Sequence, residues 1–416
     1  MLTDRGRALL ALGGLTYLGA WAFGARPLYP VALGLVLAVA GAAIWVRVLR
    51  RPMGLHRTLG AGEHLAGDDV PVRLDLSAEG RLPPATLVVR ERIARLGEWE
   101  VPLRRHGRVL RGDYVLAGVP RGRYPVESTW IVIEDPFGLE RSEVDLSRPE
   151  SLLVYPRLAA IERVFSDAGA QTPGGRRLLL RRLTGFELHS VREYEQGESL
   201  RRVHWPSTAR RGDLMVKELE DAPRDEAAIL LDGDGSTVVG SAPDSTFELQ
   251  VRIAGSLVRA HARRGRRTSL VVNSRARTYQ RVHSLDGDWQ RALELLAAIE
   301  PDGHTPASTF LADESSAAAR ALELTVVTAS LAPRLVDRLL QRALGHHAAA
   351  LVYVDPASFT PTGERDRQAD GQLLRLGRAG IPVAVVGRGD DLVEKLSAPE
   401  SMSASGLALA GGRRGG

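Results

Sequence analysis

Cysteine is missing from this chain of 416 residues. Its absence excludes disulfide bridges and thiolate metal sites, and it is typical of a protein in a reducing compartment. Lysine is almost missing too, because Lys217 and Lys395 are the only two, so arginine carries the positive charge. The arginines alternate with acidic residues and the net charge is only +5, so composition alone does not indicate a nucleic-acid-binding protein. No G-x-x-x-x-G-K-[ST] motif occurs, which excludes a phosphate-binding loop of that type.

Two apolar runs without charge stand near the start of the chain, at Ala8–Ala25 and Leu28–Val46. Each is close to the ~20 residues that an α-helix needs to cross a bilayer core. Because only Arg26-Pro27 separates them, residues 1–51 are predicted to form a transmembrane helical hairpin. Arginines flank both outer ends, which places those ends and the bulk of the chain in the cytoplasm. The chain is therefore predicted to be a multi-pass protein of the cell membrane. A cleaved signal peptide and two buried helices of a soluble fold are the alternatives.

In residues 52–150 the apolar residues recur at every second position. Several short segments alternate apolar and polar residues between glycine and proline turns, which predicts a small antiparallel β-sandwich. The expected strands lie within Val70–Ser77, Ala85–Ile93, Arg108–Gly118, Tyr124–Gly138 and Ser142–Ser147. Asp135–Gly138, with the sequence Asp-Pro-Phe-Gly, is predicted to be a tight turn. Nothing in this region indicates catalysis, so it is interpreted as a spacer or a docking surface.

Residues 151–225 form a predicted connector that contains the densest stretch of charged, aromatic and glycine residues, Gly185–Asp221. Its pattern predicts a strand, a tight turn, a short helix and a second strand. The stretch resembles the signature of a bacterial family known as DUF58, and it also includes His204. The matching residues are Arg192, Tyr194, Gly197, Glu198, Arg201, Val203, Trp205, Ala209 and Arg210.

These signature residues are interpreted as a structural and binding motif without a catalytic residue. Arg192, Glu198, Arg201 and Arg210 are expected to form a buried arginine–carboxylate network. His204 is expected to hydrogen-bond within the motif, and Trp205 to fill a seam against the domain that follows. The resemblance does not imply a reaction. It does imply an association with a MoxR-type AAA+ ATPase that assists the assembly or maturation of other proteins.

Residues 226–396 alternate apolar strands with helical segments, which predicts a parallel sheet with helices on both faces. The expected strands are 227–232, 268–274, 323–330, 349–355 and 381–387, and the expected helices are Phe247–Arg264, Trp289–Glu300, Pro333–Leu344 and Asp370–Ala379. Residues 397–416 are rich in serine, alanine and glycine and are predicted to be a disordered tail.

Two carboxylates follow the first of these strands. Asp232 and Asp234 stand at its carboxyl end together with Ser236, and such ends are where open α/β sheets bind ligands. Oxygen donors of this kind suit Mg²⁺. The arrangement resembles the Rossmann-like von Willebrand factor A domain, which implies that Thr305 completes the site. Thr328 stands where that family has a further aspartate, so the predicted magnesium site is degenerate. A polar strand-end turn without metal is the alternative.

The function predicted from these features is that of a membrane-anchored scaffold that binds another protein. Mg²⁺ is the only cofactor expected. One alternative is a metal-dependent hydrolase that uses Asp232, Asp234 and His204. Another is an arginine-rich nucleic-acid binder that uses residues 176–182 and 201–211. In those two runs Trp205 is the only aromatic residue, which argues against a platform for base stacking, so no nucleic-acid partner is expected.

Overall fold

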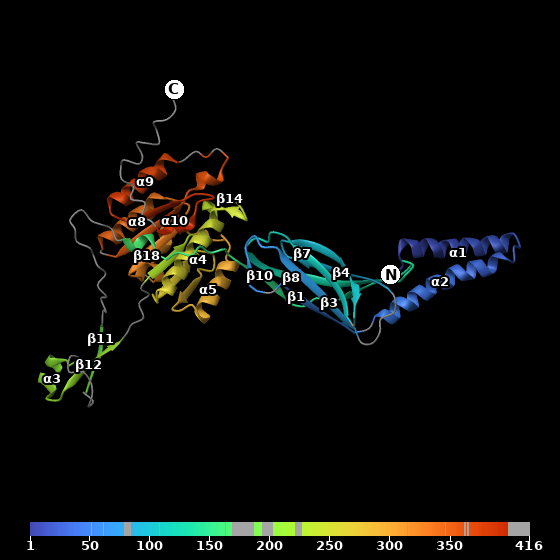
Figure 1. The fold of residues 1–416 in the computed structure, drawn as a ribbon, viewed down its shortest axis with the longest axis horizontal. Helices are drawn as coiled ribbons and strands as arrows, with labels where there is room; N and C mark the ends of the chain where they lie inside the picture. Colours follow the sequence, from blue (N-terminus) through green and yellow to red (C-terminus); the bar gives the residue numbers. More distant parts are fainter. Residues whose placement is uncertain are drawn as a thin grey trace, which may run out of the picture. The chain divides into compact units, whose positions relative to one another are not determined.

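The computed structural model describes most of the chain and divides it into two compact units (Figure 1). The first comprises Met1–Arg157 together with Glu294–Ala298, and the second comprises Leu158–Leu293 and Ile299–Gly416. The description excludes residues 51, 61, 79–84, 108, 163, 169–186, 194–202, 221–226, 314, 346, 362, 364–365 and 398–416. The predicted disordered tail and part of the signature stretch therefore lie outside the described residues.

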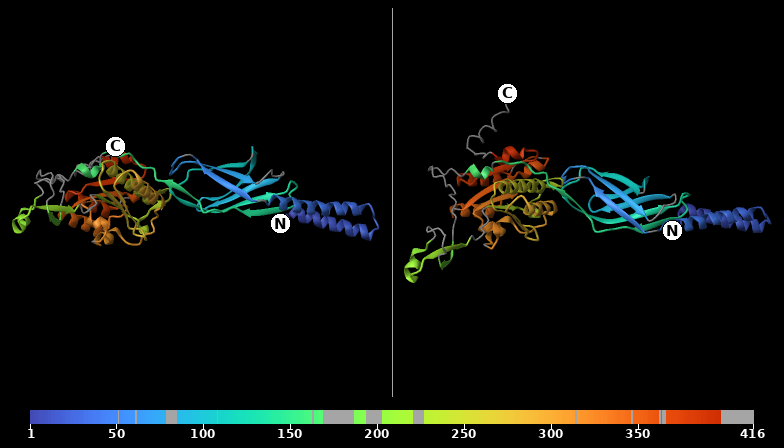
Figure 2. Two further views of the ribbon diagram at one scale, coloured as in Figure 1. Left: turned by 90° about the horizontal axis from the view of Figure 1, so that it is seen from below. Right: turned by 60° about the horizontal axis from the view of Figure 1, so that its bottom comes forward.

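The first unit begins with two antiparallel helices, α1 (Asp4–Ala22) and α2 (Leu28–Leu49) (Figures 1 and 2). α1 begins earlier than its apolar run because the Thr3 side chain accepts a hydrogen bond from the backbone nitrogen of Gly6, which caps the helix. Tyr17 and Tyr29 meet edge to face near the loop, with ring centroids 5.4 Å apart. The helical pair is thus confirmed.

Only α2, among the described helices, is long and apolar enough to cross a membrane, with a mean hydropathy of 2.2 over its best window. α1 is less apolar because Asp4, Arg5 and Arg7 occupy its first turn. Large apolar side chains on both helices are exposed, among them Leu15 at 67% and Ile44 at 65%.

The rest of the first unit is an antiparallel β region that curls around one core as a half-barrel. One sheet has the order β1-β3-β7-β6 and the other the order β2-β10-β8-β4-β5, with β9 paired to β8. β2 alone pairs in parallel, with β10. The strands are β1 (Met53–Leu59), β2 (His64–Leu65), β3 (Val70–Ala78), β4 (Thr86–Ile93), β5 (Gly97–Pro102), β6 (Arg104–His106), β7 (Val109–Leu116), β8 (Gly122–Glu134), β9 (Arg141–Asp145) and β10 (Ser151–Tyr155).

The core between the two sheets combines apolar residues with one buried ionic group. Val72 and Leu74 of β3 and Val89 of β4 are almost fully buried in it, as their strand alternation predicts. Arg57 of β1 reaches across to Glu91 of β4 and forms an ion pair with it, although the Glu91 side chain is completely buried. The sheets are therefore joined by charge as well as by apolar contact.

The second unit is built on a six-stranded sheet of order β17-β16-β13-β18-β19-β20. All neighbours run parallel except β17, which is antiparallel to β16. The strands are β13 (Ala227–Leu231), β16 (Thr268–Val272), β17 (Tyr279–Val282), β18 (Glu323–Thr328), β19 (Ala348–Val354) and β20 (Val383–Val386). Every residue of β13, β16 and β18 is buried, which explains why these strands do not alternate between apolar and exposed polar residues.

The helices of this unit follow the predicted alternation with the strands. They are α4 (Thr246–Arg263), α5 (Gly287–Ala298), α6 (Ala307–Ala312), α7 (Ala317–Arg320), α8 (Pro333–Leu344), α9 (Arg367–Arg378) and α10 (Leu392–Ser397). α4 begins where the Ser245 side chain accepts a hydrogen bond from the backbone nitrogen of Glu248. Alternate residues of β13, such as Ala228 and Leu230, share a core with the helices α6–α9. A mixed α/β sheet domain is thus confirmed.

The signature stretch contributes a two-stranded antiparallel ribbon, β11 (Glu187–Glu193) with β12 (Met215–Glu220), and the short helix α3 (Trp205–Arg211) between them. This order of strand, helix and strand agrees with the prediction. α3 ends at Gly212, whose φ of 84° is a left-handed conformation that glycine adopts without strain. Short connecting pieces elsewhere are η1 (Phe165–Ala168), β14 (Gly240–Ser241), β15 (Asp244–Ser245), η3 (Gly235–Thr237) and η4 (Pro356–Phe359).

Candidate functional site

Polar side chains collect at the carboxyl edge of the parallel sheet, around the end of β13. β13 is the first strand of the sheet and lies between β16 and β18, so the chain order reverses on its two sides. The loops after β13 and β18 therefore leave the sheet in opposite directions and create the crevice in which open α/β sheets bind ligands. Asp232 follows β13 directly, and Thr328 ends β18.

Asp232 is buried, with only 2% of its surface exposed. One carboxylate oxygen accepts a hydrogen bond of 2.6 Å from the Thr328 hydroxyl, and the other accepts one of 2.9 Å from the Asn273 amide nitrogen. Burial raises the pKa of Asp232, and these two hydrogen bonds act in the opposite direction. None of the groups that shift this pKa is a cation.

Asp234 is the second carboxylate at this edge and is also buried. Its Oδ1 atom accepts hydrogen bonds from the backbone nitrogen of Ser236 at 3.0 Å and from the Ser236 hydroxyl at 2.7 Å. This contact starts the short helix η3. Within the described part of the chain, no arginine, lysine or histidine forms an ion pair with Asp234 or with Asp232. Among the described residues, the site therefore holds two buried carboxylates without a compensating positive charge.

The loop after α5 is fastened to the loop after β13 by close backbone contact. Gly303 donates a hydrogen bond of 2.9 Å to the carbonyl oxygen of Gly233, and Gly235 donates one of 3.0 Å to the carbonyl oxygen of Gly303. A Cβ atom on Gly303 would lie 2.2 Å from the Asn273 carbonyl oxygen, so only glycine fits there. Asn273 also donates a hydrogen bond of 2.8 Å to the carbonyl oxygen of Thr305, which holds Thr305 at the same edge.

The fold thus brings together the four residues that the sequence predicted for this site: Asp232, Asp234, Ser236 and Thr305. Sequence reasoning missed Asn273, which bonds to Asp232, to Gly233 and to Thr305. An asparagine directly after a buried strand was the signal that could have identified it. Thr328 is a hydrogen-bond donor to Asp232, a role that the sequence did not reveal.

An open pocket of about 310 Å³ lies beside this cluster, at the carboxyl ends of β18 and β19. Ala329 and Ser330, which follow Thr328, form one side of it, and Tyr353 and Pro356 belong to the next strand and its loop. The first residues of α8 and α9 complete its wall.

The signature residues are described only in part. Tyr194, Gly197, Glu198 and Arg201 lie outside the described residues, and Arg192 is described only as part of the β11 backbone. The proposed network among them therefore stays a prediction for those positions.

Two expectations for the described signature residues are corrected. Trp205 is 66% exposed instead of filling a seam, and Arg210 is exposed instead of buried. The apolar contact of this segment is made by Val203 and Met215, which are 4% and 1% exposed, and the indole lies outside it. His204 does bond within the motif, because its Nδ1 atom lies 2.7 Å from the Ser207 hydroxyl.

Three or more histidine, aspartate or glutamate side chains do not converge on one point anywhere in the described part of the chain. His204 forms no hydrogen bond with Asp232 or Asp234 among the described contacts.

Comparison with known proteins places this site within a family. Residues 190–360 match the family described as "Protein of unknown function DUF58". These residues form a DUF58 domain. The match runs from the ribbon β11–β12 through β19 and includes all four predicted metal-site residues of the DUF58 domain.

A relative of this chain is the uncharacterized protein YeaD of Bacillus subtilis (strain 168), which is 23% identical over 220 residues. The aligned part covers 53% of this chain and 53% of YeaD, so the chain spans about half the length of this relative.

Among solved structures, Cwp6 from Clostridium difficile aligns with 82% of this chain and 50% of its own, at 9% identity and a TM-score of 0.19. A conjugative transposon lipoprotein from Bacteroides eggerthii aligns with 23% of this chain and 98% of its own, at 15% identity and a TM-score of 0.13. At such TM-scores the similarity supports no statement about this chain.

Proposed function

We propose that this chain is a membrane-anchored protein-interaction module whose DUF58 domain binds a partner at the carboxyl edge of its sheet. The observation that carries the proposal is the pair of buried carboxylates, Asp232 and Asp234, which follow β13 at the point where the strand order reverses. An open pocket lies at the carboxyl ends of the neighbouring strands β18 and β19. Such an edge is where α/β sheets present ligand-binding loops.

The α/β unit is, in this proposal, a von Willebrand factor A-like domain. If the six strands of the sheet are numbered along the chain, their order across the sheet is 3-2-1-4-5-6. Strand 3, which is β17, lies at the edge and runs antiparallel to its neighbour. The positions of Asp232, Asp234, Ser236 and Thr305 on the loops after β13 and α5 agree with the motif positions of that family. The β region before it is proposed to be a β-sandwich that acts as a spacer.

Mg²⁺ is proposed to bind at this edge. The donors fit a hard cation, because two carboxylates and two hydroxyls supply only oxygen. Their charge fits as well, since buried carboxylates require a partner cation or a proton. Asp232, Asp234, Ser236 and Thr305 would hold the ion. When bound, the ion would supply a positive charge to which an acidic side chain of the partner could bind.

Membrane anchoring is proposed for both helices of the hairpin. α2 is long and apolar enough to span, and the exposed leucines and aromatic residues of α1 give it an outer surface compatible with lipid. Arginines stand at the outer ends of both helices, at Arg5, Arg7, Arg47 and Arg50, while Arg26 stands alone at the loop. This asymmetry supports two spans with the bulk of the chain in the cytoplasm.

The proposed partner is a MoxR-type AAA+ ATPase. The test uses the full chain in lipid nanodiscs and measures its affinity for the purified ATPase encoded in the same genome. We expect the double variant Asp232→Asn/Asp234→Asn to bind at least about tenfold more weakly, a loss of ~1.4 kcal/mol. The matched control is Asp286→Asn, which removes an exposed carboxylate of the same unit. Mg²⁺ is kept constant throughout, because the ATPase itself requires it.

Equal affinity of the double variant and the wild-type chain would contradict the proposed role of this edge. Failure of the wild-type chain to bind the ATPase at all would contradict the proposed partner. Membrane anchoring is tested separately by alkaline carbonate extraction of native membranes, in which the chain should stay in the pellet.

A further inference from the structure

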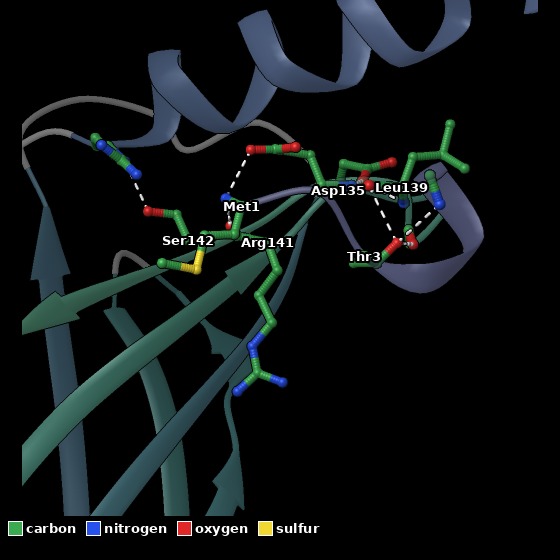
Figure 3. Close-up of polar contacts among 10 residues, drawn as sticks. Met1, Thr3, Asp135, Leu139, Arg141 and Ser142 are labelled. Atoms are coloured by element: carbon green, nitrogen blue, oxygen red, sulfur yellow. Dashed lines mark hydrogen bonds and ion pairs between the residues drawn. The ribbon is translucent and has the colours of Figure 1, made fainter. Parts of the chain in front are cut away.

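The tight turn Asp135–Gly138 lies against the base of the helical hairpin (Figure 3). The Asp135 carboxylate holds the turn, because Oδ1 accepts a hydrogen bond of 2.9 Å from the backbone nitrogen of Phe137 and Oδ2 accepts one of 2.7 Å from that of Leu139. Gly138 has a φ of +69°, which only glycine adopts readily. The turn is therefore rigid, and it presents the Phe137 ring to the outside with 77% of its surface exposed.

The turn is fastened to both helices. Thr3, the cap of α1, donates through its backbone nitrogen to the Leu139 carbonyl oxygen at 3.1 Å and through its hydroxyl to the Gly138 carbonyl oxygen at 2.6 Å. The Leu139 side chain packs against Val39 and Ala42 of α2. A Cβ atom on Gly6 would lie 2.2 Å from the Leu139 carbonyl oxygen, so α1 and the turn are in close backbone contact.

These contacts set the depth of the turn along the helices. Ala42 precedes Arg47, the basic residue in the last turn of α2, by five positions, which is about 7.5 Å along a helix axis. Because Leu139 contacts Ala42 and also Val39 farther in, the turn reaches past the level of Arg47 toward the apolar part of the hairpin. If the hairpin spans a bilayer with Arg47 at the headgroups, the turn cannot remain in bulk water.

The chemistry of the turn fits that position. An exposed aromatic ring is favourable at the boundary between headgroups and hydrocarbon. A basic side chain also lies close to the turn, because the Arg5 Nη1 atom lies 3.6 Å from the position that a Cβ atom on Gly138 would take, next to the Glu134 carboxylate. Guanidinium groups at this level attract anionic lipid headgroups.

We propose that the turn Asp135–Gly138 is a second membrane contact, in which Phe137 inserts at the boundary of the hydrocarbon and Arg5 binds anionic headgroups. The inference rests on the proposed membrane anchoring of the hairpin. Through this contact the β region is held against the bilayer surface by its own side chains, in addition to the covalent connection after α2.

The missing cysteines make a site-specific test direct. Single cysteines are introduced into the full chain at Pro136, at Val36 in the middle of α2 and at Ala117, and each is labelled with a fluorophore. Ala117 is the control far from the turn. It lies just before the start of β8, whose 13 residues extend over about 40 Å to the turn at the other end of the strand. The labelled chains are reconstituted into phosphatidylcholine vesicles with or without phosphatidylglycerol, and quenching by lipids with a spin label at shallow or deep positions is measured.

We expect the probe at Pro136 to be quenched by the shallow spin label, more strongly with phosphatidylglycerol, and the probe at Ala117 not to be quenched. Adding Phe137→Ser to the Pro136 probe should reduce this quenching, and Arg5→Gln should remove its dependence on phosphatidylglycerol. Quenching at Val36 without quenching at Pro136 would overturn the inference while the membrane anchoring stands. Absence of quenching at Val36 would overturn the anchoring and the inference together.

Discussion

The Thr328 hydroxyl donates a hydrogen bond of 2.6 Å to the carboxylate of Asp232, across two adjacent parallel strands. The contact places a neutral donor, the Thr328 hydroxyl, at the position where von Willebrand factor A domains, the family proposed for this unit, have an aspartate. Asp232 is therefore stabilised by hydrogen bonds from described neighbours, in a position where burial raises its pKa. The proposed binding site depends on whether the Asp232 carboxyl group is protonated or ionised.

The contribution of Asp232 to the stability of the folded chain is expected to decrease as the pH rises. Below about pH 4 the carboxyl is protonated in both folded and unfolded chains. Above this value the unfolded chain releases the proton first, since the folded pKa is raised, and the folded state loses stability until the pH passes the folded pKa. Urea titrations of the full chain in detergent, without divalent ions, should show this slope, and Asp232→Asn should remove it. An unchanged slope in the variant would contradict the assignment.

Thr328→Asp should convert the site into one that depends on metal. Without Mg²⁺ the new carboxylate faces Asp232 in a buried position, and we expect a loss of stability of roughly 3 kcal/mol or more from the added unpaired charge. Added Mg²⁺ should restore much of this loss through linkage to binding. The measurement is the unfolding midpoint with and without Mg²⁺, with Thr328→Val as the control that removes only the hydroxyl. An unfolding midpoint of Thr328→Asp that is the same with and without Mg²⁺ would exclude a cation at this edge.

Gly303→Ala should separate the two loops that form the site. The added methyl group would meet the backbone oxygens of Asn273 and Gly233, at 2.2 Å and 2.7 Å, and neither can move without breaking the loop contact. We expect a loss of about 1–3 kcal/mol from this overpacking and a weaker partner affinity. Gly287→Ala is the control, because a Cβ atom there meets no atom within 4 Å. Similar unfolding midpoints for the two variants would show that the contact is not required.

Arg57→Met should destabilise the β region severely. It leaves Glu91 as a fully buried, unpaired charge, and the expected loss is about 3–5 kcal/mol. Tyr114 and Thr129 also donate hydrogen bonds to Glu91, and burial, followed by the charge of Glu91, raises the pKa of the Tyr114 hydroxyl.

The double variant Arg57→Met/Glu91→Leu should be more stable than Arg57→Met alone, because it removes both charges together. A double-mutant cycle measured by urea unfolding gives the coupling energy. Strict additivity of the two single changes would show that the ion pair contributes no coupling.

Gly6→Ala should loosen the helical hairpin from the turn that follows β8. The methyl group would clash with the Leu139 carbonyl oxygen, a backbone atom fixed by the hydrogen bonds of the turn. We expect faster proteolytic cleavage near Gly138, because the turn loses its contact with α1. Gly14→Ala, where a Cβ atom meets no neighbour, is the matched control on the same helix. Equal cleavage rates in the two variants would contradict this role of Gly6.

The sequence predicted the elements of this protein better than their contacts. The apolar runs, the alternating strands and the five buried strands of the α/β unit were recognised because period and hydrophobicity are local properties. Short strands without a strong pattern, such as β1, β5 and β10, were missed, since their pairing depends on neighbours distant in the chain. Trp205 was expected to be buried because it is large and apolar, but Val203 and Met215 supply that contact instead.

The candidate site shows the same division. Asp232, Asp234 and Ser236 could be identified from the sequence, because adjacent carboxylates and a hydroxyl after an apolar strand form a local signal. The sequence thus determined that oxygen donors stand at a strand end. Only the tertiary structure decided that Asn273 and Thr328 bind Asp232, that Gly303 brings Thr305 to the same edge, and that both carboxylates are buried. These relationships join residues of separate strands and loops, and burial and hydrogen bonding between such residues exist only once the sheet has formed.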